Sequence, residues 1–246
     1  MNTFDFGFDD FEDSAHENPL EDLVAAYEAD PSSYFDSSEL EEIASFYFEE
    51  GEMKKALGVI DHLIELHPYT SDAWMRRGIL LNNLGRQDEA LEAYEQALDI
   101  NPTDTETLIN LGITLDSLGR VDEALDAYHE ALSINPLHGE ALFNLGVTLE
   151  RDEQLEAAVE AFEQCVDVYP EHPEVWYELG YCYDRLAENE KSVEAYDNHL
   201  DIDPYSQDAW YNRGIVLNRL GRFEEAVSSY DMALAIHDEF ASAYYN

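Results

Sequence analysis

Residues 71–104 read SDAWMRRGILLNNLGRQDEALEAYEQALDINPTD, and this stretch decides the fold. Its first half spaces apolar and small residues such as Trp74 and Gly78 as one face of a helix requires, and Gly85 then supplies a left-handed helix end. Its second half opens with acidic residues, which suit a helix N-terminus, and stops at Pro102. The stretch therefore predicts two antiparallel helices joined by a short turn.

The same pattern recurs along the chain every 34 residues. A proline, a small residue, an alanine and an aromatic ring each keep this period, with few exceptions. The prolines are Pro68, Pro102, Pro136, Pro170 and Pro204. The units that follow are 37–70, 71–104, 105–138, 139–172, 173–206 and 207–240. One helix pair cannot bury this much apolar surface alone, so the repeat predicts an all-α solenoid of stacked pairs.

These units resemble the tetratricopeptide repeat family. The matching residues are Trp74, Gly78, Ala90, Tyr94, Ala97 and Pro102, together with Trp210, Gly214, Leu217, Ala226, Tyr230 and Ala233. The resemblance covers residues 37–246 and implies a right-handed superhelix of antiparallel helix pairs. It also implies that the second, fifth, sixth, ninth, twelfth and thirteenth positions of each first helix face the concave groove.

The two ends of the chain differ from the repeats. Residues 1–18 are acidic and rich in phenylalanine, which favours a disordered segment. Residues 19–36 predict a short capping helix followed by a linker. Residues 241–246 look like the start of a seventh, truncated repeat, and arrays of this kind normally end in a polar capping helix. We therefore expect the chain to be a fragment of a longer repeat protein.

The composition excludes several classes of protein. The 246 residues include 56 Asp and Glu but only 12 Lys and Arg, and the formal charge of −44 would repel nucleic acid. No apolar run is long enough to span a bilayer. The first basic residue is Lys54, so no secretory signal is expected, and we predict a cytoplasmic protein. The acidity indicates a salt-loving source, with an ordinary acidic bacterial protein as the alternative.

The sequence contains no constellation typical of an enzyme. It has no glycine-rich phosphate loop with its lysine, and its histidines are scattered. Cys165 and Cys182 lack the spacing of a metal site and are expected to be reduced thiols in a helical core. We therefore predict no catalytic activity, no metal and no cofactor.

The implied groove positions supply the candidate binding residues. They are Asn110, Asn144, Tyr177, Tyr181, Arg185, Tyr211, Asn212 and Arg219. The asparagines occupy sixth positions, and a carboxamide can bond both the N–H and the C=O of an extended peptide. They resemble the asparagine ladder in the tetratricopeptide region of the O-linked N-acetylglucosamine transferases. The alternative is that asparagine is merely tolerated at an exposed helix position.

The aromatic and basic candidates also have two interpretations each. The tyrosines provide the apolar contact of a binding hot spot, or they pack against one another between successive first helices. Arg185 and Arg219 form a positive strip that binds a carboxylate, or each pairs with a nearby acid on its own helix. A chaperone carboxylate clamp is disfavoured, because no fifth position carries the lysine that such clamps use.

The resulting hypothesis is a non-enzymatic scaffold or adaptor. Its groove would bind an extended peptide or protein segment, with an acidic or carboxylate-bearing ligand favoured and residues 140–220 as the main site. One alternative is a repeat region that positions or regulates an enzymatic or membrane domain missing from this chain. Another is an architectural module that self-associates through the C-terminal edge near Tyr244 or through the phenylalanine-rich segment.

Overall fold

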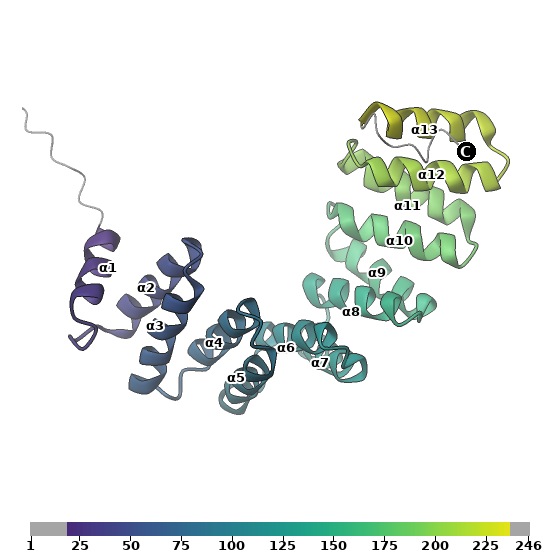
Figure 1. Ribbon diagram of the computed structural model, residues 1–246. Helices are drawn as coiled ribbons and strands as arrows, with labels where there is room; N and C mark the ends of the chain where they lie inside the picture. The colour runs from purple at the N-terminus through teal and green to yellow at the C-terminus, as the bar shows by residue number, and fades with distance from the viewer. Residues whose placement is uncertain (1–18, 237–246) are drawn as a thin grey trace, which may run out of the picture.

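The computed structural model describes residues 19–236, and within this range every regular element is an α-helix (Figure 1). The first helices of the six units are α2 (Ser37–Glu49), α4 (Ser71–Asn83), α6 (Thr105–Ser117), α8 (Gly139–Arg151), α10 (Pro173–Arg185) and α12 (Gln207–Arg219). The second helices are α3 (Met53–Leu66), α5 (Gln87–Ile100), α7 (Val121–Ile134), α9 (Leu155–Val168), α11 (Asn189–Ile202) and α13 (Phe223–Ile236). Each first helix begins at the first residue of a predicted unit, and the all-helical fold is confirmed.

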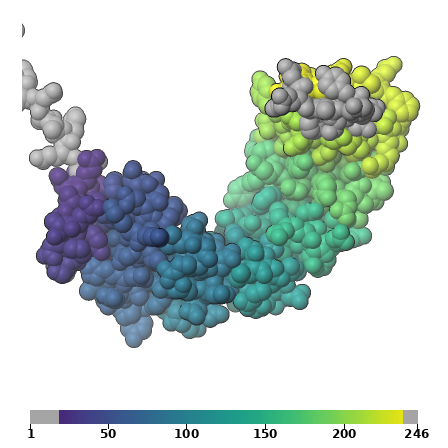
Figure 2. Space-filling model, in the orientation of Figure 1, coloured from purple at the N-terminus to yellow at the C-terminus, as the bar shows by residue number. Residues whose placement is uncertain are grey.

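The helix pairs stack in chain order into an open arc. Helices α1–α3 lie at one end of the arc, and α12 and α13 lie at the other (Figure 1). The space-filling view shows a broad hollow between these two ends (Figure 2). None of the described helices is long and apolar enough to cross a bilayer.

An additional helix, α1 (Pro19–Ala29), precedes the first unit and packs against α2. The side chain of Val24 is buried, and the ring of Tyr27 meets Phe35 edge to face with centroids 5.3 Å apart. This helix lies within the predicted 19–36 segment. The predicted phenylalanine-rich segment 1–18 and the seventh repeat lie outside the described residues.

A glycine and an aromatic ring hold the two helices of each later pair together. The rings of Tyr94, Tyr128, Phe162, Tyr196 and Tyr230 cover Gly78, Gly112, Gly146, Gly180 and Gly214, respectively. A Cβ atom on these glycines would come within 2.3–2.8 Å of the ring. Only glycine therefore allows the first helix to approach the ring so closely.

The turns between paired helices require the left-handed backbone conformation. Gly85 adopts it with φ of 73°, as the sequence predicts, and three further glycines do the same. In units 139–172 and 173–206 the corresponding residues are Glu153 and Ala187, which take φ of 60° without being glycine. The turn geometry is thus preserved where the favourable residue is missing.

Candidate peptide-binding surface

Successive first helices contact one another from α4 to α12, so they form a continuous surface along the array. A cavity of about 330 Å³ marks this surface between α2, α4 and α6. Its lining includes Met75 and Arg76, at the fifth and sixth positions of α4, and Glu106, at the second position of α6. Positions implied to face the groove therefore do converge on a common cavity at this end of the molecule.

The candidate asparagines differ in what their side chains contact. Asn110 and Asn144 each fold back on their own helix, where the Nδ2 group donates to the carbonyl of Glu106 or Glu140 at 2.9 Å. Each then keeps its carbonyl oxygen and its second N–H for another partner. Asn212 instead donates to the hydroxyl of Tyr177 on the preceding first helix, at 3.0 Å.

The aromatic candidates pack mainly against the second helix of their own pair. Tyr177 meets Tyr196 edge to face with ring centroids 5.8 Å apart, and Tyr211 lies 5.9 Å from Tyr230. Tyr177 also lies 5.5 Å from the ring of His199. Tyr177, Tyr181 and Tyr211 are each half-buried, so part of each ring surface stays exposed.

The arginines at thirteenth positions connect neighbouring first helices. Arg151 donates to Asp116 at 2.5 Å, and Arg219 donates to Asp184; in each case the acid lies on the preceding first helix. The expected pairing with an acid is thus observed, but across helices instead of within one. Each such bridge ties two repeats together along the hollow side.

Arg185 departs from this pattern. Its Nη1 group donates to the hydroxyl of Tyr181 at 3.0 Å, and its other Nη nitrogen lies 3.7 Å from a carboxylate oxygen of Glu153. The guanidinium also lies 5.8 Å from the centre of the Tyr181 ring. Glu150, which occupies the position equivalent to Asp116 and Asp184, therefore forms no ion pair of this kind among the described residues, and its charge acts on Arg185 only at longer range.

Glu150 also acts on the neighbouring acid Glu178. Glu178 stands at the sixth position of α10, where three other units have asparagine. Burial raises the pKa of Glu178 to about 7, and the negative charge of Glu150 adds to the shift. The carboxyl groups of Glu150 and Glu178 thus lie near enough to interact, and among the described residues neither forms an ion pair.

Nearly all the positive charge of the protein is already used internally. Eleven of the twelve Lys and Arg side chains form ion pairs with Asp or Glu. The chain has 56 acids against 12 Lys and Arg, so carboxylates far outnumber the cations available to pair with them. The arrangement consequently does not favour the expected acidic or carboxylate-bearing ligand, because Arg185 and Arg219 are engaged by acids of their own.

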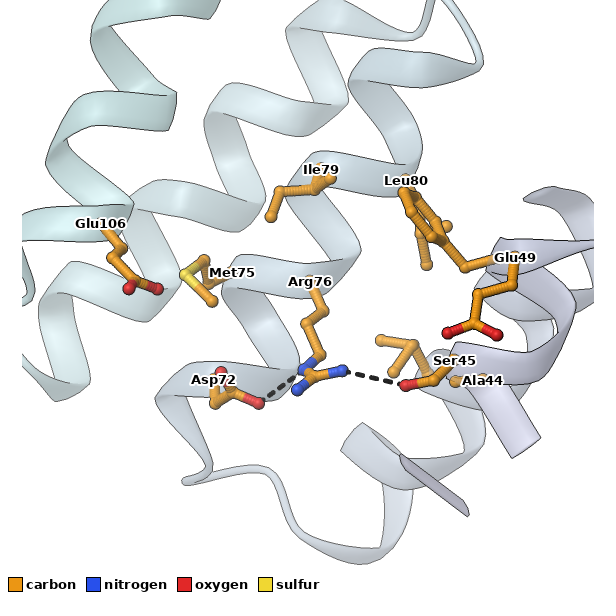
Figure 3. A pocket seen from close by; sticks show the side chains of 11 residues that line it. Ala44, Ser45, Glu49, Asp72, Met75, Arg76, Ile79, Leu80 and Glu106 are labelled. Carbon is orange, nitrogen blue, oxygen red and sulfur yellow. Dashed lines mark hydrogen bonds and ion pairs between the residues drawn. The ribbon is translucent and has the colours of Figure 1, made fainter. Parts of the chain in front are cut away.

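Sequence reasoning did not single out the cavity between α2 and α4. Arg76 lies at its centre, where Nε donates to Asp72 at 2.7 Å and Nη1 donates to Ser45 at 3.4 Å (Figure 3). Apolar side chains, including Met75 and Ile79, form its walls. The sequence did contain a signal for this cavity. Met75, Arg76 and Ile79 occupy three of the positions implied to face the groove in α4, and they place two apolar side chains beside one positive charge.

Metal-ligating clusters and cysteines are the other possible sources of chemistry among the described residues. They contain no group of three or more side chains placed to hold a metal ion. Cys165 and Cys182 are buried and free, and burial raises their pKa values to about 11 and about 12. Both are therefore protonated thiols at neutral pH, unsuited to act as nucleophiles or metal ligands.

Comparison with known families agrees with the helix pairing. Family models described as tetratricopeptide repeat match residues 71–104 and 208–240, residues 104–171 and residues 151–207. Together these matches cover more than half of the chain. No match is found among curated proteins.

Three solved structures illustrate the similarity of this chain to known helical repeat proteins. MamA is 27% identical, with a TM-score of 0.63 over 67% of this chain and 96% of that chain. YrrB, described as a TPR protein with an unusual peptide-binding site, is 21% identical, with a TM-score of 0.67 over 76% of this chain and 96% of its own. The pilF protein of Pseudomonas aeruginosa is 17% identical, with a TM-score of 0.71 over 92% and 97%.

Proposed function

Because the chain belongs to the tetratricopeptide repeat family, we propose that it is a non-enzymatic scaffold that binds an extended segment of another protein along its inner groove. The observation that carries this proposal is the run of polar and aromatic side chains on successive first helices, which contact one another along the array. YrrB shares the fold and is described as a TPR protein with an unusual peptide-binding site, which supports peptide binding as a use of this fold.

The proposed contacts follow from the groups that the fold leaves free. Asn110 and Asn144 offer a carbonyl oxygen and an N–H to the backbone of an extended segment, since only one N–H of each is used internally. Asn212 is held by Tyr177 and offers its remaining carboxamide groups in a defined orientation. Backbone recognition of this kind binds a chain without requiring one particular sequence.

The aromatic residues supply the apolar part of the proposed site. Tyr177, Tyr181 and Tyr211 are each partly exposed, so a bound side chain would cover ring surface that water now covers. Their packing against the second helices, or against Arg185 in the case of Tyr181, holds the rings in place before binding. A site that is ordered in advance loses less entropy when the ligand binds.

A peptide selection tests the proposal directly. Peptides selected from a random library on the immobilised protein should bind the wild type, and Asn144→Ala/Tyr177→Ala/Asn212→Ala should weaken their binding by at least tenfold. The control variant Tyr69→Ala/Tyr205→Ala removes two highly exposed rings from the turns between units and should bind normally. Circular dichroism should report equal helicity for all three proteins. Unchanged binding by the triple variant would refute this site.

A further inference from the structure

The cavity between α2 and α4 combines an apolar interior with a charged rim. Met75 and Ile79 from α4 line it together with Phe48 from α2, a residue that is 42% exposed. The buried residues Leu80 and Ile60 complete its apolar lining. An apolar side chain from outside would therefore exchange water for contact with hydrocarbon on several sides.

The rim of this cavity is negative despite the arginine at its centre. Asp72 neutralises Arg76, whereas the carboxylates of Glu49 and Glu106 have no ion-pair or hydrogen-bond partner among the described residues. Glu49 is also the last residue of α2, where the partial charge of the helix end is negative. The negative end of α2 therefore repels the carboxylate of Glu49, and a cation bound beside Glu49 would offset this repulsion.

A second hollow continues the cavity toward α1 and increases the negative charge. Ser45, Glu49 and Arg76 line both spaces, and the second space adds Glu41 and Glu42 at the fifth and sixth positions of α2. The apolar interior is therefore flanked by four carboxylates along the direction in which an extended ligand would run. Such a surface attracts a basic segment and repels an acidic one.

We propose that this cavity binds one aromatic or long aliphatic side chain of a partner segment whose neighbouring residues are lysine or arginine. The apolar side chain enters between Met75, Ile79 and Phe48, and the flanking cations pair with Glu49 and Glu106. The Nη2 group of Arg76, which Asp72 and Ser45 leave free, donates to a backbone carbonyl of the segment. This inference rests on the proposed function and names the chemistry of the partner.

The chain's own residues 1–18 are the competing occupant. They contain four phenylalanines, which suit the apolar interior, but also six acids and no lysine or arginine. The negative charge of this segment would be repelled by the carboxylates of Glu49 and Glu106. Charge complementarity therefore favours a basic partner over this segment.

Three labelled peptides test the proposal by fluorescence anisotropy. All are acetylated and amidated; the first has one phenylalanine flanked by two lysines on each side, the second replaces the lysines by glutamates, and the third replaces the phenylalanine by serine. The first peptide should bind at least tenfold more tightly than either of the others, because the cavity requires both features. Its affinity should fall as salt is added. Equal binding of the lysine and glutamate peptides, or tighter binding of the glutamate peptide, would overturn the proposal.

Charge reversal at the rim provides a second test. Glu49→Lys/Glu106→Lys should weaken the first peptide at least tenfold, whereas Glu65→Lys/Glu92→Lys, on exposed positions of the second helices, should change its affinity less than twofold. Both pairs change the net charge equally, so a difference reports the place of the charge. Equal effects would overturn the proposal, as would a tenfold gain in affinity on deleting residues 1–18, which would identify that segment as the occupant.

The two sets of variants distinguish failure of the cavity inference from failure of the proposed function. If the alanine substitutions at Asn144, Tyr177 and Asn212 abolish binding of the selected peptides while the rim reversal has no effect on the lysine peptide, the groove stands and the cavity inference falls. If the rim reversal is effective and the alanine substitutions are not, the cavity stands and the groove site at residues 140–220 falls.

Discussion

Replacing Gly78 by alanine should lower the stability of the protein, whereas the same change at Gly58 should raise it. Both glycines lie inside helices, in α4 and α3, respectively. A Cβ atom on Gly58 would have no neighbour within 4 Å. A Cβ atom on Gly78 would lie 2.3 Å from Cε1 of Tyr94, whose side chain is only 1% exposed.

The expected magnitude follows from two opposing contributions. Alanine is favoured over glycine inside a helix by about 0.5–1 kcal/mol, and both variants gain this amount. At Gly78 the new carbon is more than an ångström closer than the ~3.5 Å at which carbon atoms normally touch. Overpacking of this kind costs about 1–3 kcal/mol in a well-packed core. The free energies of unfolding of the two variants should therefore differ by about 1–3 kcal/mol, because the helix contribution cancels.

Urea denaturation followed by circular dichroism measures this difference. Gly180→Ala provides an internal scale, because its Cβ would lie 2.8 Å from Tyr196 and should require a smaller displacement of the ring. In a Tyr94→Leu background, the change at Gly78 should lose most of its cost. If Gly78→Ala were as stable as Gly58→Ala, the interpretation of Tyr94 as a rigid spacer between the paired helices would be wrong.

Two further predictions concern charge. The melting temperature should rise from dilute buffer to molar salt because the −44 formal charge is then screened, and a flat response in circular dichroism melts would exclude this effect. Glu178, with its pKa raised to about 7, binds its proton more tightly in the folded state, so its contribution to stability is lost as pH rises from about 4.5 through 7. Glu178→Gln should therefore match the wild type near pH 4.5 and exceed its free energy of unfolding by about 1–2 kcal/mol at pH 8, after allowance for solvent screening. Urea titrations at both pH values should show no such trend for the exposed control Glu160→Gln, and an equal trend in both variants would contradict the assignment to Glu178.

The contacts inside one helix pair were predictable from the sequence. Gly78 and Tyr94 are separated by 16 residues, and the same spacing recurs in the later units, so one steric rule explains all of them. In unit 173–206 the sequence places Ser192 and His199 where the repeat pattern has small apolar residues. The sequence did not show which groups these polar side chains contact. Ser192 donates to the carbonyl of Gly180 at 2.7 Å, and His199 Nδ1 bonds the carbonyl of Pro173 at 2.8 Å, so both side chains are anchored to α10. The buried Nε2 of His199 has no hydrogen-bond partner among the described residues.

The candidate site was only partly predictable. The repeat positions indicated which side of each first helix Asn144 and Tyr177 occupy, but they did not indicate what these side chains contact. The bond between Asn212 and Tyr177, and the pairing of Arg219 with Asp184, each join residues 35 positions apart on different helices. Pairs of that kind depend on how far one unit is rotated against the next.

The sequence by itself determined the 34-residue unit, its two helices and the small and aromatic residues that hold them together. These features depend on helical spacing, on turn residues such as Gly85 and on packing between chain neighbours, all of which are local. Only the tertiary structure decided that the arginines are neutralised across helices and that a cavity opens around Arg76. The physical reason is that the curvature of the arc accumulates from small rotations between units, and this curvature sets which side chains on successive first helices come within bonding distance.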